Sequence, residues 1–506
     1  MTLPVLFSNR RVRIAACCRL LMLAIACLLS SSAVAAQPNV LFLAIDDLRP
    51  ALGCYGDPLA KTPHIDRLAA SSRLFLAAYC NQAVCGPSRT AVFTGRLPDN
   101  TRVWHNRHRF RDHAPALVTL PEFFKAAGYH TQSIGKTFSG DEREDDPQSW
   151  SVPAVLSVPG VRNYARVEST SKKGKGVAAE AADVVDQGYP DGRLADLAVE
   201  TLTALKDADQ PFFLAVGFLK PHLPFNAPKR YWDLHAREAF LAVNQPDRTT
   251  GVPNASYPDH AELGGYRGIS SDEQLSAEQT AELRHGYYAC VSYVDAQVGR
   301  VLAAVAELEL DESTIVVLWG DHGYSLGEGD HWCKATNFER DTRVPLLIRF
   351  PGMPLPGAPT SAIIEYVDLY PTVAALAGLS PPATLDGTSL LPILMDPAAA
   401  GRDAALSQYQ RPWKAKDPQL MGYSLRTATH RYTRWIEWPA GPTIAEELYD
   451  YGRLATAEDG GAPFVEVRNQ IDDAELSAIR NQLREHLDTM LTRRIAARAV
   501  DSDSHE

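Results

Sequence analysis

Residues 39–47, NVLFLAIDD, form an apolar run that ends abruptly at two aspartates. Short apolar runs that do not alternate with polar residues are typical of strands buried on both faces of a parallel sheet. Further runs of this kind are residues 212–216, 314–319 and 345–350. The segment 39–47 therefore predicts a central strand with acidic residues at its carboxyl end.

Helical patterns lie between the apolar runs, for example at residues 291–308. Strands that alternate with helices predict an α/β sandwich built on a large mixed, mainly parallel sheet. Asp46-Asp47 and Asp321-His322 each follow such a strand, at the sheet edge where α/β folds bind ligands. One aspartate after a strand is often only a turn former or helix cap. Several strand ends with polar clusters favour a ligand site.

The last quarter of the chain has a different pattern. Residues 395–402, MDPAAAGR, have the composition of a linker, and residues 423–427 and 432–436 predict a small antiparallel sheet beyond it. A final helix is predicted from the apolar stripe Leu476, Ile479, Leu483, Leu487 and Met490. We therefore expect a large domain at 37–395 and a smaller C-terminal subdomain at 403–506.

The first 36 residues have the pattern of a cleaved signal peptide. An arginine-rich beginning is followed by the apolar run 20–29 and by Ala33-Val34-Ala35, a cleavage site of small residues. The apolar run is too short for a bilayer-spanning helix. We expect residues 1–36 to be removed and the protein to be exported to the periplasm or the cell exterior, without a membrane span.

Composition narrows the class of partner. The chain has 506 residues and a net charge of −11, which argues against nucleic acid, because phosphate backbones favour clustered Lys and Arg. A polyanionic substrate needs only a locally basic pocket. Beyond the signal peptide five cysteines remain, an odd number that leaves at least one without an intramolecular partner. They are Cys54, Cys80, Cys85, Cys290 and Cys333.

The most specific motif is CGPSRTAVFTGR at residues 85–96. By itself Cys85 is also compatible with a structural or metal-binding cysteine that precedes a helix. The whole run, however, resembles the sulfatase family, whose signature is Cys-x-Pro-Ser-Arg followed by Thr-Gly-Arg. The resemblance implies an alkaline-phosphatase-like sandwich, with residues 37–395 as the catalytic domain. It also implies that a maturation enzyme oxidises Cys85 to formylglycine, whose hydrate attacks sulfur through one hydroxyl and releases sulfate through the other.

The two polar pairs at strand ends suggest a cation. Hard divalent cations prefer carboxylate oxygens, and a cation here would hold a sulfate oxygen. The same resemblance implies one calcium ion bound by Asp46, Asp47, Asp321, His322 and the modified Cys85. Taken singly, each pair is equally compatible with capping or turn formation.

Several isolated basic residues lie in short motifs that resemble those of the same family: Gly135-Lys136, Lys220-Pro221-His222 and Trp332-Cys333-Lys334. With Arg89, these cations would stabilise the charge that builds as the ester bond breaks. His222 has the chemistry to protonate the leaving alkoxide. A single surface lysine is usually only a solvated charge, so the catalytic roles of Arg89, Lys136, His222 and Lys334 are implied by the resemblance.

Nearly the whole mature chain resembles the iduronate-2-sulfatase group, for example in DDLRP at 46–50 and DHGYSLGE at 321–328. This group implies a sulfated sugar whose ester lies beside a uronic acid carboxylate. Ser139 stands where the group has a histidine that helps to hold sulfate. Lys414 and Lys416 are candidates for binding the carboxylate, and Tyr324 for flanking the sugar. Solvated lysines and aromatic packing are the simpler interpretations of these three residues.

Two other functions stay open at this point. A phosphodiesterase or phosphonate monoester hydrolase on the same fold can also use formylglycine. Alkaline phosphatases use two or three metals, whereas the sequence offers ligands for one, which favours a sulfatase. A non-catalytic protein that binds sulfated glycans would need broken catalytic residues, and Ser139 is the departure from the family pattern that we find.

Overall fold

The computed structural model describes residues 37–138, 145–158, 163–171, 175–241, 248–270, 274–454 and 466–503. The predicted signal peptide and Ser139 lie outside these residues. Residues Asn39–Glu506 form one compact unit, so the predicted subdomain at 403–506 is part of the same unit as the α/β sandwich. The helices are α2 (Pro63–Ala69), α3 (Cys85–Thr94), α4 (Pro98–Thr101), α5 (Leu120–Ala126), α6 (Pro190–Lys206), α7 (Lys229–Trp232), α8 (Glu238–Leu241), α9 (Ala277–Glu307), α10 (Glu339–Thr342), α11 (Leu369–Leu376), α12 (Leu391–Met395), α13 (Tyr451–Leu454) and α14 (Ser477–Asp503).

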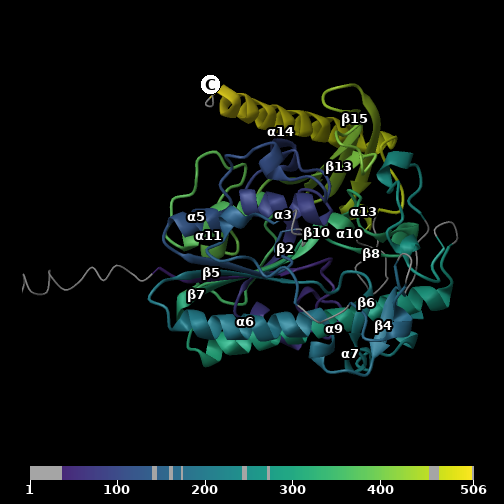
Figure 1. The fold of residues 1–506 in the computed structure, drawn as a ribbon. Coiled ribbons are helices and arrows are strands. Elements are labelled where there is room, and N and C mark those ends of the chain that lie inside the picture. The colour runs from purple at the N-terminus through teal and green to yellow at the C-terminus, as the bar shows by residue number, and fades with distance from the viewer. Residues whose placement is uncertain are drawn as a thin grey trace, which may run out of the picture. The chain divides into compact units, whose positions relative to one another are not determined.

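A mixed sheet of eight strands lies at the centre of this unit (Figure 1). Its order is β11-β2-β10-β7-β1-β5-β3, with β12 paired to β2. Strand β1 pairs in parallel with both β5 and β7, whereas β10 runs antiparallel to β2 and β7. The strands are β1 (Asn39–Ile45), β2 (Arg73–Tyr79), β3 (His130–Gly135), β5 (Phe212–Phe218), β7 (Thr314–Gly320), β10 (Arg343–Arg349), β11 (Pro359–Thr360) and β12 (Ile364–Glu365). The predicted mixed, mainly parallel sheet is confirmed. The run 345–350, which was predicted as a strand of the parallel kind, corresponds to β10 and is antiparallel to both its neighbours.

Both faces of β1 are buried, which explains why its sequence does not alternate. Leu41, Leu43 and Ile45 pack in a core cluster with residues of α6 and α9. The intervening residues Val40 and Phe42 pack in a second cluster with residues of α3, α5 and α11. Figure 1 shows α6 and α9 below the sheet and α3, α5 and α11 above it.

Helix α9 is longer than the sequence pattern at 291–308 indicated. It begins after Ser276, whose side chain forms a capping box with Gln279. By length and composition α9 would be long and apolar enough to cross a membrane, but 72% of its most apolar window is buried inside the protein. This burial is what a core helix of a folded domain requires.

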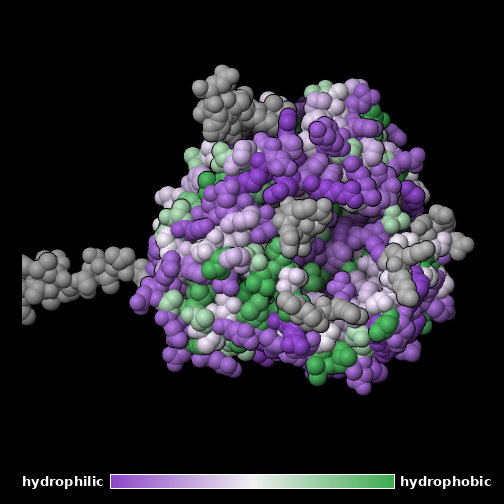
Figure 2. Space-filling model, in the orientation of Figure 1, coloured by the Kyte–Doolittle hydropathy of each residue, from purple (hydrophilic) through white to green (hydrophobic). Residues whose placement is uncertain are grey.

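The C-terminal region contains the predicted antiparallel sheet, with the order β13-β14-β15-β16. Leu483 and Leu487 of α14 are buried against it, as the apolar stripe predicted. Ser407 of β13 donates to the Cys80 carbonyl at 2.7 Å, which ties this sheet to the end of β2. In Figure 2 the upper region, formed by this sheet and α14, is mostly hydrophilic. The strands are β13 (Ala404–Arg411), β14 (Leu420–Thr427), β15 (His430–Glu437) and β16 (Thr443–Asp450).

Two small sheets complete the fold beside the carboxyl ends of the central strands. Strand β4 (Ala179–Ala182) pairs in parallel with β6 (Phe225–Pro228), and β8 (Ser325–Leu326) pairs antiparallel with β9 (Trp332–Cys333). Strand β9 leads directly into Lys334, so this hairpin determines where that lysine lies.

Candidate active site

The carboxyl ends of β1 and β7 bring the two predicted polar pairs together. The parallel register aligns Ile45 with Gly320, so the residues that follow these two leave the sheet side by side. The backbone N–H of Asp47 donates to Asp321 Oδ1 at 2.9 Å. His322 Nε2 lies 3.3 Å from Asp47 Oδ1. The side chains of both pairs are almost completely buried.

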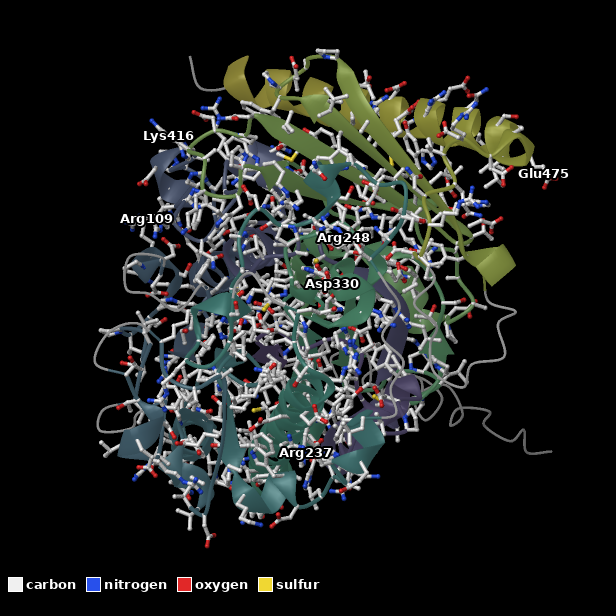
Figure 3. All side chains as sticks on the ribbon, turned by 90° about the vertical axis from the view of Figure 1, so that its right-hand side faces the viewer. Arg109, Arg237, Arg248, Asp330, Lys416 and Glu475 are labelled. Atoms are coloured by element: carbon white, nitrogen blue, oxygen red, sulfur yellow. The ribbon has the colours of Figure 1, made fainter. Side chains whose placement is uncertain are left out.

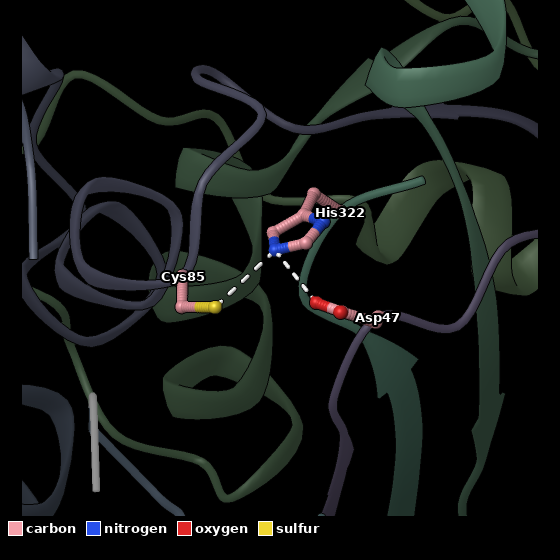
Figure 4. Close-up of side chains that lie close together, drawn as sticks. All are labelled: Asp47, Cys85 and His322. Atoms are coloured by element: carbon pink, nitrogen blue, oxygen red, sulfur yellow. Dashed lines mark hydrogen bonds and ion pairs between the residues drawn. The ribbon is translucent and has the colours of Figure 1, made fainter. Parts of the chain in front are cut away.

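Cys85 is the first residue of α3, and its thiol points at these pairs. Its Sγ lies 3.4 Å from Asp46 Oδ1 and 3.4 Å from His322 Nε2, as Figure 4 shows for His322. A helix N-terminus carries partial positive charge, which favours an anion at this position. Burial and the neighbouring Asp46 raise the pKa of the Cys85 thiol. All five cysteines of the described chain are free.

The cluster has the donor set of a site for a hard cation. The ligand atoms of Asp46, Cys85 and Asp321 lie within 4.8 Å of one another, and so do those of Asp47, Cys85 and His322. Three carboxylates in one buried place require positive charge to offset their repulsion. Carboxylate oxygens are what Ca²⁺ prefers, so the residues present fit the metal that the family implies.

Arg89 joins α3 to both strand ends. Its guanidinium is fully buried, with Nε 2.9 Å from Asp321 Oδ2 and NH2 3.3 Å from Asp46 Oδ1. It also donates to the carbonyl oxygens of Lys136 and Thr137, which follow β3. Arg89 therefore fixes the carboxylates in place rather than facing the pocket.

Lys136 and Lys334 approach the carboxylates from two sides. Lys136 Nζ lies 2.6 Å from Asp46 Oδ2 and 3.4 Å from Cys85 Sγ, and Lys334 Nζ lies 2.9 Å from Asp47 Oδ1. Burial opposes both ammonium charges, but Asp46 raises the pKa of Lys136 and Asp47 raises the pKa of Lys334. Burial also opposes the charge of Asp46, yet Lys136 and the other nearby cations hold its carboxyl pKa well below the ordinary value.

His222 and Glu262 form the next layer outward. His222 Nε2 lies 3.4 Å from Glu262 Oε1 and 3.9 Å from Asp47 Oδ2, and its side chain is 28% exposed. Glu262 Oε2 is 3.2 Å from Lys334 Nζ. Burial opposes ionisation of Glu262, but Lys334 and then His222 lower its pKa to about 2. A carboxylate thus lies among the cations that would receive an anionic substrate.

These residues open into a pocket of about 360 Å³. Lys334 and His222 line this pocket, together with Trp413 and Lys414 from the loop after β13. His260 stacks on Trp413 with ring centroids 4.2 Å apart. Asn106 also lines the pocket and accepts a hydrogen bond from the Gly86 N–H at 2.9 Å, directly beside Cys85.

The remaining predicted substrate contacts are placed differently. Lys414 lines the pocket, whereas Lys416 is exposed and is not part of the lining. Tyr324 is fully buried, and its ring is stacked on that of Tyr287 with the ring centroids 5.5 Å apart. Its position therefore agrees with aromatic packing rather than with a contact to the sugar. Sequence reasoning missed Glu262, His260 and Asn106, which no local motif distinguishes. Trp413 was also missed, although its position directly before the candidate Lys414 could have indicated that it lines the pocket.

Comparison with known proteins identifies the family to which the chain is related. Residues 38–379 match the sulfatase family, and residues 327–493 match the C-terminal region of N-sulphoglucosamine sulphohydrolase. Iduronate 2-sulfatase of Homo sapiens is 34% identical, over 79% of this chain and 85% of that protein. Choline-sulfatase of Rhizobium meliloti (strain 1021) is 28% identical, over 83% of this chain and 86% of that protein.

The fold has relatives among solved structures. A phosphonate monoester hydrolase from Silicibacter pomeroyi superposes with a TM-score of 0.73 at 25% identity, and the match covers 90% of this chain and 96% of that chain. The alkaline-phosphatase-like sandwich expected from the sequence is therefore confirmed. Because the family match spans most of the chain, including every residue of the carboxylate and cysteine cluster, the chain belongs to the sulfatase family of sulfuric ester hydrolases.

Proposed function

We propose that this sulfatase removes sulfate from a sulfated sugar in which the ester lies beside a uronic acid carboxylate. The observation that carries this proposal is the combination of the buried Cys85 cluster with a pocket that is lined by Lys414. The 34% identity to human iduronate 2-sulfatase supports the same class of substrate.

The proposal includes one calcium ion bound by Asp46, Asp47, Asp321, His322 and the modified Cys85. A bound calcium ion would hold a sulfate oxygen and draw charge from sulfur. Formylglycine made from Cys85 supplies a hydroxyl nucleophile that also provides a route for sulfate release. The three carboxylates are what favours a hard cation over a softer one.

The protein's own side chains would then orient and neutralise the ester. Lys136 and Lys334 flank the Cys85 cluster and place positive charge where sulfate oxygens would lie. His222, partly exposed at the base of the pocket, is the group in position to give a proton to the leaving alkoxide. Arg89 holds the carboxylates of Asp46 and Asp321 in position and would act on the substrate only through them.

Recognition of the sugar carboxylate would fall to Lys414. Its ammonium group is exposed at the pocket wall and lies 5.3 Å from the centre of the Trp413 ring. A cation at a defined distance from the sulfate site separates substrates with two negative charges from neutral sulfated sugars.

Phosphonate monoester hydrolysis is the second candidate, and the structural similarity to the Silicibacter pomeroyi enzyme is the observation that favours it. A sulfate monoester and a phosphonate monoester each carry one negative charge, so the charge of the pocket does not separate the two activities and a direct assay is needed. Nitrophenyl sulfate and nitrophenyl phenylphosphonate, assayed side by side, separate the two activities. A higher kcat/KM for the phosphonate would overturn the sulfatase proposal.

The full test begins with protein co-expressed with a formylglycine-generating enzyme. Mass spectrometry of the peptide that contains Cys85 should show the aldehyde. Turnover of a 2-sulfated uronate disaccharide should exceed that of a neutral sulfated hexose, and Lys414→Ala should reduce this preference about tenfold. Lys206→Ala, an exposed lysine at the end of α6, is the matched control. Equal turnover of both sugars by the wild-type protein would exclude the uronate assignment.

A further inference from the structure

A second positively charged region begins at the pocket and continues along the surface. Residues 102–113 and 413–417 carry more exposed cations than anions, although the whole chain is acidic. The exposed cations are Arg102, Arg107, Arg109, Lys414 and Lys416, against the exposed anions Asp112 and Asp417. We call Arg107, Arg109 and Lys416 the basic strip. Figure 3 shows Arg109 and Lys416 at the same edge of the view.

The basic strip is continuous with the pocket through packed side chains. Arg107 follows Asn106, which lines the pocket beside Cys85. The ring of His105 lies 3.7 Å from that of His108 and 6.3 Å from that of Trp413, which is also in the pocket wall. Asp417 and Lys416 of the second segment both act electrostatically on His108 of the first, Asp417 the more strongly. The two segments therefore form one surface that starts where the substrate enters.

Within the part of the chain that the structure describes, no hydrogen bond or ion pair is formed by the side chains of Arg107, Arg109 or Lys416. Arg111 of the same segment differs, because it is held by Glu122 and Asp146, both at 2.7 Å. Arg111 has a structural role, whereas the basic strip is free to bind an external anion.

The histidines between these cations contribute little charge at neutral pH. Burial, together with the neighbouring His108 and Arg107, lowers the pKa of His105 to about 4. Burial and His113 also lower the pKa of His108. The positive charge of this surface is therefore permanent rather than switched by pH.

We propose that the basic strip binds the sulfated residues of a polysaccharide chain that adjoin the sugar held in the pocket. The enzyme would then engage several residues of its substrate rather than the reacting sugar alone. This inference rests on the proposed function, because it takes the pocket to hold one residue of a longer sulfated chain. Charge complementarity favours a repeating polyanion over a neutral glycan or a small sulfate ester.

The test compares oligosaccharides of increasing length that share the same terminal 2-sulfated uronate disaccharide. For the wild type, KM should fall from the disaccharide to the octasaccharide while kcat stays constant. For Arg107→Ala/Arg109→Ala, the octasaccharide KM should rise about fivefold, because each exposed ion pair contributes little, and the disaccharide KM should not change. The dependence of log KM on log salt should become shallower for the octasaccharide.

Two further variants make the comparison specific. Arg107→Lys/Arg109→Lys should keep most of the length effect, since it preserves the charge. Arg237→Ala removes one exposed arginine near the bottom of the view in Figure 3, away from Arg109 and Lys416, and should behave as wild type. If KM is independent of length in the wild type, or if the alanine variant keeps the full length effect, the inference is wrong.

Failure of the inference is distinguishable from failure of the proposed function. If wild-type protein hydrolyses none of these oligosaccharides, the proposed function is wrong for these substrates, and retention on immobilised heparin then tests the basic strip alone. Elution of Arg107→Ala/Arg109→Ala at clearly lower salt than wild type and Arg237→Ala would support a polyanion-binding surface. Elution of all three proteins at one salt concentration would overturn it.

Discussion

Glu262 is a carboxylate within a pocket built to receive an anion. It takes part of the charge of Lys334 and contacts His222, so it limits how strongly the pocket attracts any negative group. Its oxygens are also acceptors at the pocket surface, where a sugar hydroxyl is a suitable donor and a sulfate is not. Under the proposed function, Glu262 would favour a sugar sulfate over an inorganic anion.

The charge of Glu262 should be visible in the stability of the protein. Its pKa in the folded state is about 2, against an ordinary value of 4.5, so its stabilising effect is complete above about pH 5 and is lost as the pH falls from 4.5 towards 2. We expect Glu262→Gln to lower the free energy of unfolding by about 2 kcal/mol at pH 7 and by much less near pH 3. Urea unfolding at several pH values measures this, and a difference that stays constant with pH would contradict it.

At the scale of elements, α3 is positioned by Arg89. One buried guanidinium joins the start of this helix to the ends of β1, β3 and β7. The arrangement keeps Cys85 within 3.4 Å of Asp46 without any covalent link between the elements. The same contacts stabilise the fold and place the nucleophile.

We expect Arg89→Met to cost about 3–5 kcal/mol of unfolding free energy, because two buried carboxylates lose their partner while the volume is nearly kept. Activity should be lost as well, since Asp46 and Asp321 would no longer be held in register. Arg67→Met, at an exposed position in α2, is the matched control and should change stability by less than about 0.5 kcal/mol. Equal urea midpoints for the two variants would refute the bridging role of Arg89.

At the scale of the whole molecule, the site draws on both sheets. The central sheet supplies the carboxylates, while the loop that follows β13 of the C-terminal sheet supplies Trp413 and Lys414. The carboxylate cluster is thus built on the central sheet, and the loop that carries the proposed uronate contact follows a strand of the smaller sheet.

Metal removal tests this arrangement as a whole. A ligand that binds only the folded state adds about 2.7 kcal/mol at one hundred times its Kd, which for a chain of this length corresponds to roughly 3 °C in Tm. We expect EDTA to lower Tm by about this amount and added Ca²⁺ to restore it. Asp321→Asn should show little response to either. If wild-type Tm is the same with EDTA and with Ca²⁺, the predicted metal site is absent.

Much of this molecule was determined by local sequence. The apolar run 39–45 needed no tertiary information to indicate a strand buried on both faces, because every side chain along it had to leave water. The parallel pairing of β1 and β7 then placed Asp46, Asp47, Asp321 and His322 at one edge. The start of α3 at Cys85 was compatible with the motif at 85–96, whose residues are all buried as far as Thr94.

Other features were decided only by the tertiary structure. Strand β10 has the same apolar pattern as the parallel strands but runs antiparallel, because the direction of a buried strand depends on its connections and not on its side chains. Glu262, His260 and Asn106 reach the pocket from loops that no periodic pattern constrains. Lys414 and Lys416 differ by two positions in sequence, yet only Lys414 lines the pocket, because the path of the loop determines which side chain faces inward. Local sequence sets which surfaces must be buried, whereas contacts between distant loops depend on how the whole chain packs.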